Sequence, residues 1–161
     1  MSISFYLEQS FNQFSTSSHP VLHSFFHSTP LTSFTMATSV LSKDAPAPSP
    51  LMSQAVTYNG IVYCSGSLGI DPSTGKFAEG TVTDRTAQAL KNLEAVLKAA
   101  GSSLENVLKV NIFLSSIDYY GGVNDAYAKF FTQEVKPCRT CVIVAELPLG
   151  AEVEIEATAY L

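Results

Sequence analysis

One stretch near the C-terminus reads Pro137-Cys-Arg-Thr-Cys-Val-Ile-Val-Ala-Glu-Leu-Pro-Leu-Gly-Ala-Glu-Val-Glu-Ile-Glu-Ala157, and it lies in the most apolar part of the chain. It is rich in β-branched residues, and turn signals stand at Pro148 and Gly150. The pattern predicts two strands, Cys138–Glu146 and Glu152–Tyr160, joined by a tight connection.

Alternation along these two strands sorts their polar side chains onto faces. Arg139 and Cys141 share one face of the first strand, and Glu152, Glu154 and Glu156 share one face of the second. We therefore expect a cation and a carboxylate to lie close together on neighbouring strands. An arginine inside so apolar a strand needs a partner or a ligand, because a buried, unpaired charge is costly.

The charge balance argues against nucleic acid and membranes as partners. The chain has 161 residues, enough for one domain, and its 14 acidic and 9 basic residues give a formal net charge of −5. Such a surface repels phosphate backbones and anionic lipids. No stretch approaches the roughly 18 consecutive apolar residues of a transmembrane helix.

The positions of the cysteines and histidines do not indicate a metal or cofactor site. Cys138 and Cys141 have the C-x-x-C redox spacing, but that motif usually stands at the start of a helix, and these residues lie in a predicted strand. His19, His23 and His27 are spaced to share a helical face, as metal ligands do. Nearby prolines and the Ser/Thr-rich composition favour a flexible tail instead, and the rest of the chain has no histidine for a zinc site or a catalytic triad.

The N-terminal region differs from the remainder of the chain. Residues 1–42 contain neither Lys nor Arg, which argues against a secretory signal and against a mitochondrial transit peptide. We expect residues 1–44 to be a disordered extension and residues 45–161 to be the folded domain. Met36, followed by Ala-Thr-Ser, is a candidate for an alternative start.

Periodicity predicts the order β-β-α-β-α-β-β for this domain. Asn59-Gly60 between two β-prone runs is a strong hairpin signal. The elements expected before the last two strands are hairpin strands at Ser53–Thr57 and Ile61–Ser65, a helix at Thr83–Ala100, a strand at Val107–Ser115 and a helix at Tyr119–Glu134.

Two helices cannot cover both faces of one sheet. Residues 142–145 and much of Val107–Leu114 are nevertheless apolar on both faces, which is typical of strands that are buried on both faces. We therefore expect an oligomer whose sheets pack against each other, with active-site clefts between subunits.

Several short motifs occur together from about Ala45 to Leu161. They are Pro137-Cys-Arg-Thr-Cys-Val142, Leu147-Pro148, Val153-Glu-Ile-Glu-Ala157, Ser53-Gln-Ala55, Ser65-Gly66 and Val123-Asn-Asp-Ala-Tyr127. In these motifs the chain resembles the RidA/YjgF family of reactive-intermediate deaminases, also called the endoribonuclease L-PSP family. The resemblance implies a chorismate-mutase-like α+β fold with both helices on one face of a mixed sheet, and a homotrimer with three clefts between subunits.

The resemblance also implies an activity and a site. The activity is hydrolysis of 2-imino acids or their enamine tautomers, such as 2-iminobutanoate and 2-iminopropanoate, to 2-oxo acids and ammonia, without a metal or organic cofactor. Arg139 matches the family arginine that holds the substrate carboxylate, and Glu154 matches the carboxylate associated with the attacking water. The other matches line the cleft, and they are Ser65, Gly66, Asn124 and Cys141.

The chain departs from the family pattern at two positions. Met52 stands where the family usually has a tyrosine, and Ser67 stands where glutamine is common. We expect these changes to shift substrate preference or to slow the reaction.

Other interpretations stay open at this point. An endoribonuclease or translation inhibitor is disfavoured by the acidic balance and by the lack of histidine in the domain. A non-catalytic binder of small carboxylates, or a chaperone, is kept open by Met52. Arg139 has the alternative role of a structural salt bridge with one of the glutamates at the subunit boundary. The expected compartment is the cytoplasm, with the mitochondrion as alternative. The resemblance implies both, because members of the family occur in both.

Overall fold

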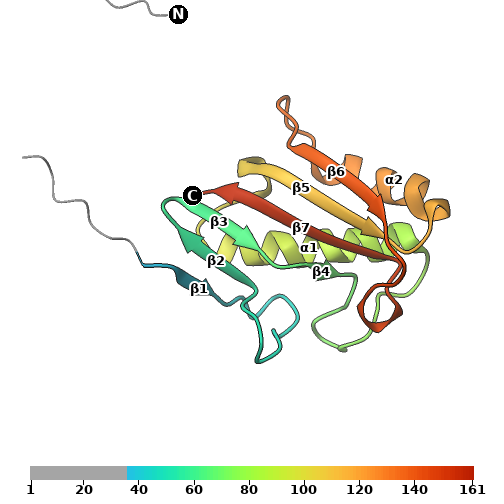
Figure 1. The fold of residues 1–161 in the computed structure, drawn as a ribbon, viewed down its shortest axis with the longest axis horizontal. Helices are drawn as coiled ribbons and strands as arrows, with labels where there is room; N and C mark the ends of the chain where they lie inside the picture. Colours follow the sequence, from blue (N-terminus) through green and yellow to red (C-terminus); the bar gives the residue numbers. More distant parts are fainter. Residues whose placement is uncertain (1–35) are drawn as a thin grey trace, which may run out of the picture. The chain divides into compact units, whose positions relative to one another are not determined.

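Residues 36–161 are described by a computed structural model. They form one mixed sheet with two helices behind one of its faces (Figure 1). In chain order the elements are β1 (Thr38–Val40), β2 (Ala55–Tyr58), β3 (Ile61–Cys64), β4 (Ser67–Leu68), α1 (Val82–Ala99), β5 (Val107–Leu114), α2 (Tyr120–Phe130), β6 (Cys138–Ile143) and β7 (Val153–Tyr160). The predicted α+β fold and its β-β-α-β-α-β-β order are confirmed, with β1 and β4 as additions.

The sheet order corrects one prediction about the C-terminal strands. Across the sheet the order is β1-β2-β3-β7-β5-β6, and the short β4 also pairs with β7. β6 runs parallel to β5, whereas β7 pairs antiparallel with the other edge of β5. The two strands predicted to be neighbours are thus separated by β5. The expected closeness of the cation and the carboxylate on adjacent strands is therefore wrong.

The β2–β3 hairpin forms where the sequence predicts it. Asn59 and Gly60 both have positive φ, at 49° and 77°, and Tyr58 pairs with Ile61 across the turn. Positive φ at both turn positions is the reason why Asn-Gly is favoured in two-residue hairpin loops.

The sheet begins before residue 45. β1 pairs antiparallel with β2, and the backbone N–H of Ser42 donates to Oε1 of the buried Gln54 at 2.6 Å. The Gln54 amide donates in return to the carbonyls of Ser42 and Pro46. Residues 38–44 thus take part in the fold, although they fall inside the predicted extension. The histidines of that extension lie outside the described residues.

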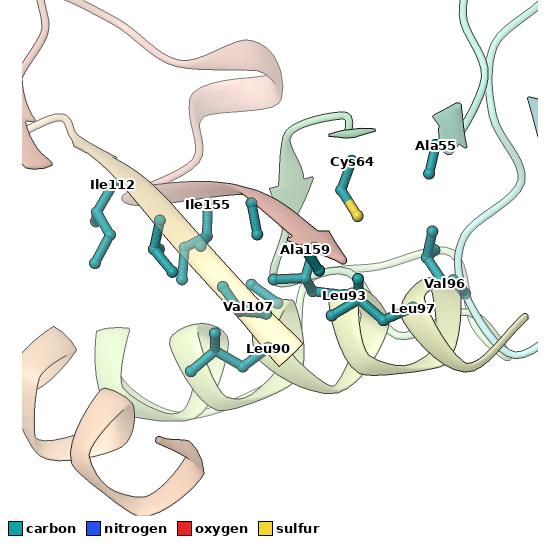
Figure 2. Packing of buried hydrophobic residues seen from close by; sticks show 14 of the residues in the cluster. Ala55, Cys64, Leu90, Leu93, Val96, Leu97, Val107, Ile112, Ile155 and Ala159 are labelled. Carbon is teal, nitrogen blue, oxygen red and sulfur yellow. The ribbon is translucent and has the colours of Figure 1, made fainter. Parts of the chain in front are cut away.

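The helix α1 supplies most of the core on its side of the sheet. Its start is stabilised by Asp84, whose Oδ2 accepts from the backbone N–H of Thr81 at 2.8 Å. Leu90, Leu93 and Leu97 are fully buried and point toward the sheet (Figure 2). In Figure 2 they lie opposite side chains of β5 and β7, which include Val107, Ile112, Ile155 and Ala159.

The other face of the sheet is polar at its centre. Lys109 donates to Thr140 at 2.6 Å, and Asn111 donates to Glu156 at 2.7 Å. Apolar side chains on this face are also exposed, and Val142 and Tyr160 are among them. Within residues 36–161 no helix covers this face. The oligomer expected to cover it stays a prediction.

Candidate active site

Arg139 lies on β6, the edge strand next to α2. Register pairs it with Val110, a fully buried residue that faces the helices, so Arg139 points to the helix side as well. Its Nη1 donates to Oδ1 of Asn124 at 2.7 Å, and its Nη2 donates to the Tyr120 hydroxyl at 3.4 Å. Its Cζ stands 4.8 Å from the centroid of the Tyr127 ring. We call these residues, with Cys141 two positions further along β6, the arginine group.

The partners of Arg139 are all neutral. Among the described residues no carboxylate lies within 4.0 Å of its guanidinium, whereas the other arginine, Arg85, pairs with Glu152 at 2.5 Å. The salt bridge considered for Arg139 would lie at a subunit boundary, so it stays a prediction. Within this part of the chain, the positive charge of Arg139 is left available to an anion.

The C-x-x-C pair does not form a disulfide here. Cys138 and Cys141 are both free thiols. They are three positions apart on one strand, so they point to opposite faces of the sheet, which a disulfide cannot bridge. Burial raises the pKa of Cys141, and the nearby Arg139 charge opposes this only partly, so the thiol form is favoured at neutral pH.

A second group of predicted site residues gathers where β7 meets the short segment between β3 and β4. A Cβ added at Gly66 would lie only 1.9 Å from Oε1 of Glu154, so the carboxylate rests directly on this glycine. Ser65 precedes it, and its hydroxyl donates to the carbonyl of Ser53 at 2.7 Å. We call Ser65, Gly66 and Glu154 the glutamate group.

Helix α1 holds the segment that follows Gly66. The Ser67 hydroxyl donates to the carbonyl of Ala89 at 2.9 Å. The buried amide of Asn92 donates to the carbonyls of Leu68 and Ile70, at 3.1 and 2.7 Å. These bonds tie β4 and the loop after it to the rigid helix, so the glycine beneath the Glu154 carboxylate is held in place.

Glu154 and Glu156 of β7, and Glu152 directly before it, have different surroundings. Glu152 pairs with Arg85, and Glu156 accepts from Asn111. The carboxylate of Glu154 accepts no hydrogen bond from the described residues, and burial, followed by the neighbouring Glu156 charge, raises the pKa of Glu154 above its ordinary value. Of the three, Glu154 is the carboxylate left free to bind water or a ligand.

The arginine and glutamate groups are not brought together within one chain. Glu154 pairs with Phe113 of β5, and Phe113 pairs on its other side with Val142 of β6. Val142 lies three positions beyond Arg139 and points to the opposite face of the sheet. Arg139 and Glu154 are therefore offset by three residues along the strands, which is about 10 Å, and by two strand spacings across the sheet, which is about 10 Å at right angles. One small ligand therefore cannot touch both groups of the same chain.

Met52 lies beside the glutamate group. It is 47% exposed and lines a cavity of about 160 Å³ together with Ser65 and Gly66. Most other lining residues are apolar, and they come from the 45–49 segment, from Leu68 and Ile70, and from α1. The departure from the family pattern at Met52 thus adds an apolar side chain to this wall.

Sequence reasoning missed two members of the arginine group, Tyr120 and Tyr127. The available signal was their spacing with Asn124, because residues four and three positions apart lie on one face of a helix. Tyr127 also stacks on Phe131, with ring centroids 4.4 Å apart.

The described part of the chain contains no helix long and apolar enough to cross a membrane. Within the same residues, no group of three or more His, Cys, Asp or Glu side chains is arranged to hold a metal ion.

The mixed sheet, with two helices on one face, defines a small α+β protein of the chorismate-mutase-like type. Residues 42–161 match the endoribonuclease L-PSP family. The 2-iminobutanoate/2-iminopropanoate deaminase of Rattus norvegicus is 42% identical over 120 residues, which cover 74% of this chain and 87% of that protein. Reactive Intermediate Deaminase A, chloroplastic, of Arabidopsis thaliana is 40% identical over 140 residues, which cover 83% of this chain and 74% of that protein.

A solved structure agrees with these matches. The crystal structure of E. coli TdcF with bound serine has a TM-score of 0.73 and 31% identity, and the alignment covers 77% of this chain and 98% of that one. The chain therefore belongs to the endoribonuclease L-PSP family, which is the RidA/YjgF family.

Proposed function

We propose that this protein hydrolyses 2-imino acids, or their enamine tautomers, to 2-oxo acids and ammonia. The observation that carries the proposal is Arg139, a guanidinium whose described partners are all neutral and whose charge therefore suits a carboxylate. Support comes from the deaminase names of the rat and Arabidopsis relatives, and from the serine bound to TdcF, which is a small amino acid with a carboxylate.

The proposed chemistry needs few groups. Arg139 holds the substrate carboxylate and so fixes the position of the C=N carbon. A water near Glu154 adds its oxygen to that carbon, and the carboxylate accepts a proton from the water. The nitrogen is then protonated, the C–N bond breaks, and ammonia leaves as the C=O bond forms. Ser65, Gly66, Asn124 and Cys141 are proposed to line the cleft, and no metal or cofactor takes part.

We propose further that each site is built from two copies of the chain. The arginine group of one copy would meet the glutamate group of the next, because one chain holds them on opposite faces of its sheet. A closed ring of three copies, the proposed homotrimer, would contain three such sites.

A coupled assay tests the proposed activity. 2-Iminobutanoate is generated with a threonine dehydratase, and 2-oxobutanoate formation is followed with and without the protein. We expect faster 2-oxobutanoate formation with the protein present. An unchanged rate would contradict the proposal, and binding without acceleration would favour a carboxylate-binding protein. Cleavage of RNA that survives in Arg139→Ala would favour the endoribonuclease alternative.

Mixing two impaired variants, assayed at a substrate concentration well below the wild-type KM, tests the shared site. Arg139→Ala and Glu154→Gln are produced separately and then co-refolded in equal amounts. Half of the copies then supply an intact Arg139 and half supply an intact Glu154, so about a quarter of the wild-type activity should return in mixed rings. Each variant refolded alone is the control. A mixture no more active than its components, shown by native mass measurement to contain both chains, would mean that one chain provides the whole site.

The proposed compartment is the cytoplasm, with the mitochondrion as alternative. The Arabidopsis relative is named as a chloroplastic protein, a compartment outside both of these proposals.

A further inference from the structure

One face of α2 surrounds the guanidinium of Arg139. Tyr120, Asn124 and Tyr127 are four and three positions apart, so their side chains project from the same side of the helix. Each contacts Arg139 in a different way. Asn124 accepts at one end nitrogen, Tyr120 accepts at the other, and the Tyr127 ring lies against the guanidinium.

The Tyr127 contact depends on its ring. The Tyr127 hydroxyl is buried and has no hydrogen-bond partner among the described residues. The ring is itself supported, because it stacks on Phe131, which is 1% exposed. The aromatic face is the part of an aromatic side chain that attracts a cation.

Together these contacts restrict how the guanidinium can turn. Two edge contacts and one ring contact define the plane of the group, whereas a solvated arginine side chain samples many rotamers. Nε–H and one N–H of each end nitrogen have no acceptor among the described residues. These groups remain for a planar carboxylate.

We propose that Tyr127 is a positioning residue for ligand binding, and that it acts by holding the plane of the Arg139 guanidinium through its ring. The inference rests on the proposed function for its kinetic test, because it assigns a role in binding the substrate carboxylate. Tyr120 and Asn124 complete the same support from the edges of the guanidinium.

The first test does not require the enzymatic reaction. Arg85 and Arg139 are the only arginines of the chain, so an arginine side-chain NMR spectrum contains only two guanidinium groups. Without ligand, Arg139 should give two resolved end-nitrogen signals, because rotation about its Cζ–Nε bond is hindered. Its assignment follows from Arg85→Lys, which removes the other signal. One averaged Arg139 signal in the wild-type protein would overturn the proposal.

The second test separates the ring from the hydroxyl. Tyr127→Leu should raise KM for the imine on the order of tenfold, with a smaller change in kcat, since a desolvated cation–π contact corresponds to about that factor. It should also merge the two Arg139 signals. Tyr127→Phe should keep both signals, keep KM within about twofold, and leave thermal stability equal or higher, because it removes only an unpartnered buried hydroxyl. Tyr58→Leu, at a tyrosine of the β2–β3 hairpin that is 47% exposed, is the matched control.

The outcomes distinguish this proposal from the proposed function. If the wild-type protein does not accelerate imine hydrolysis, the deaminase proposal fails while the NMR test still stands. If the wild-type protein is active and folded Tyr127→Leu keeps its KM, the positioning role is wrong. If Tyr127→Phe loses as much as Tyr127→Leu, the hydroxyl and not the ring is responsible, which also overturns it.

Discussion

Arg139→Ala should lower kcat/KM for 2-iminobutanoate on the order of a hundredfold. The variant removes charge-assisted hydrogen bonds to the substrate carboxylate, which are worth roughly 1.5–3 kcal/mol each. The effect should appear mainly in KM, because the proposed clamp binds substrate before and during the reaction. Steady-state kinetics in the coupled dehydratase assay measure both constants.

The chain offers a matched control for this experiment in Arg85. That residue is also a partly buried arginine, but its charge is paired with Glu152 at 2.5 Å. Arg85→Ala should therefore lower thermal stability, by leaving Glu152 without its partner, and should affect kcat/KM much less than Arg139→Ala. Full activity in a folded Arg139→Ala protein would refute the clamp. Equal losses in both variants would show that the effect is general and not specific to the site.

Glu154→Gln should lower kcat by about 10²–10⁴-fold, the range typical for the loss of a general acid or base. Glutamine keeps the shape of the side chain but cannot accept a proton from water. KM should change little, because the carboxylate is not proposed to hold the substrate. A kcat within about threefold of wild type would exclude the assigned role.

The same substitution should change how stability depends on pH. Burial and the Glu156 charge raise the pKa of Glu154 in the folded protein, so the folded state holds this proton more tightly than the unfolded chain does. The contribution to stability is present below the ordinary carboxyl pKa and is lost as pH rises through the raised pKa. As pH rises from the ordinary carboxyl pKa through the raised pKa, the free energy of unfolding of the wild-type protein should fall relative to that of Glu154→Gln. Denaturant unfolding at a series of pH values measures the difference, and parallel curves would contradict it.

Gly66→Ala provides an independent test of the carboxylate position. The added methyl group would occupy the place of Oε1 of Glu154, but only the end of a flexible side chain has to move. The protein should therefore fold and lose kcat in the same direction as Glu154→Gln. A fully active, folded Gly66→Ala protein would show that the position of Glu154 on this glycine is not needed for the reaction.

The local elements follow from the sequence because their causes are local. The Asn59-Gly60 turn, the apolar stripe of α1 and the alternation of β7 are all set by residues within a few positions of one another. The alternation correctly places Glu154 and Glu156 on the face opposite Ile155. The family motif selects Arg139 and Glu154 from the other charged residues, since spacing alone does not rank them.

The sequence by itself therefore determined the elements, the α+β class, the family and the two charged candidates. Only the tertiary structure decided the strand order, because pairing of β5 between β6 and β7 depends on contacts between distant segments. It also decided the surroundings of the two charges. Arg139 is held by neutral groups of α2 and Glu154 rests on Gly66, since both positions arise where separate elements pack together.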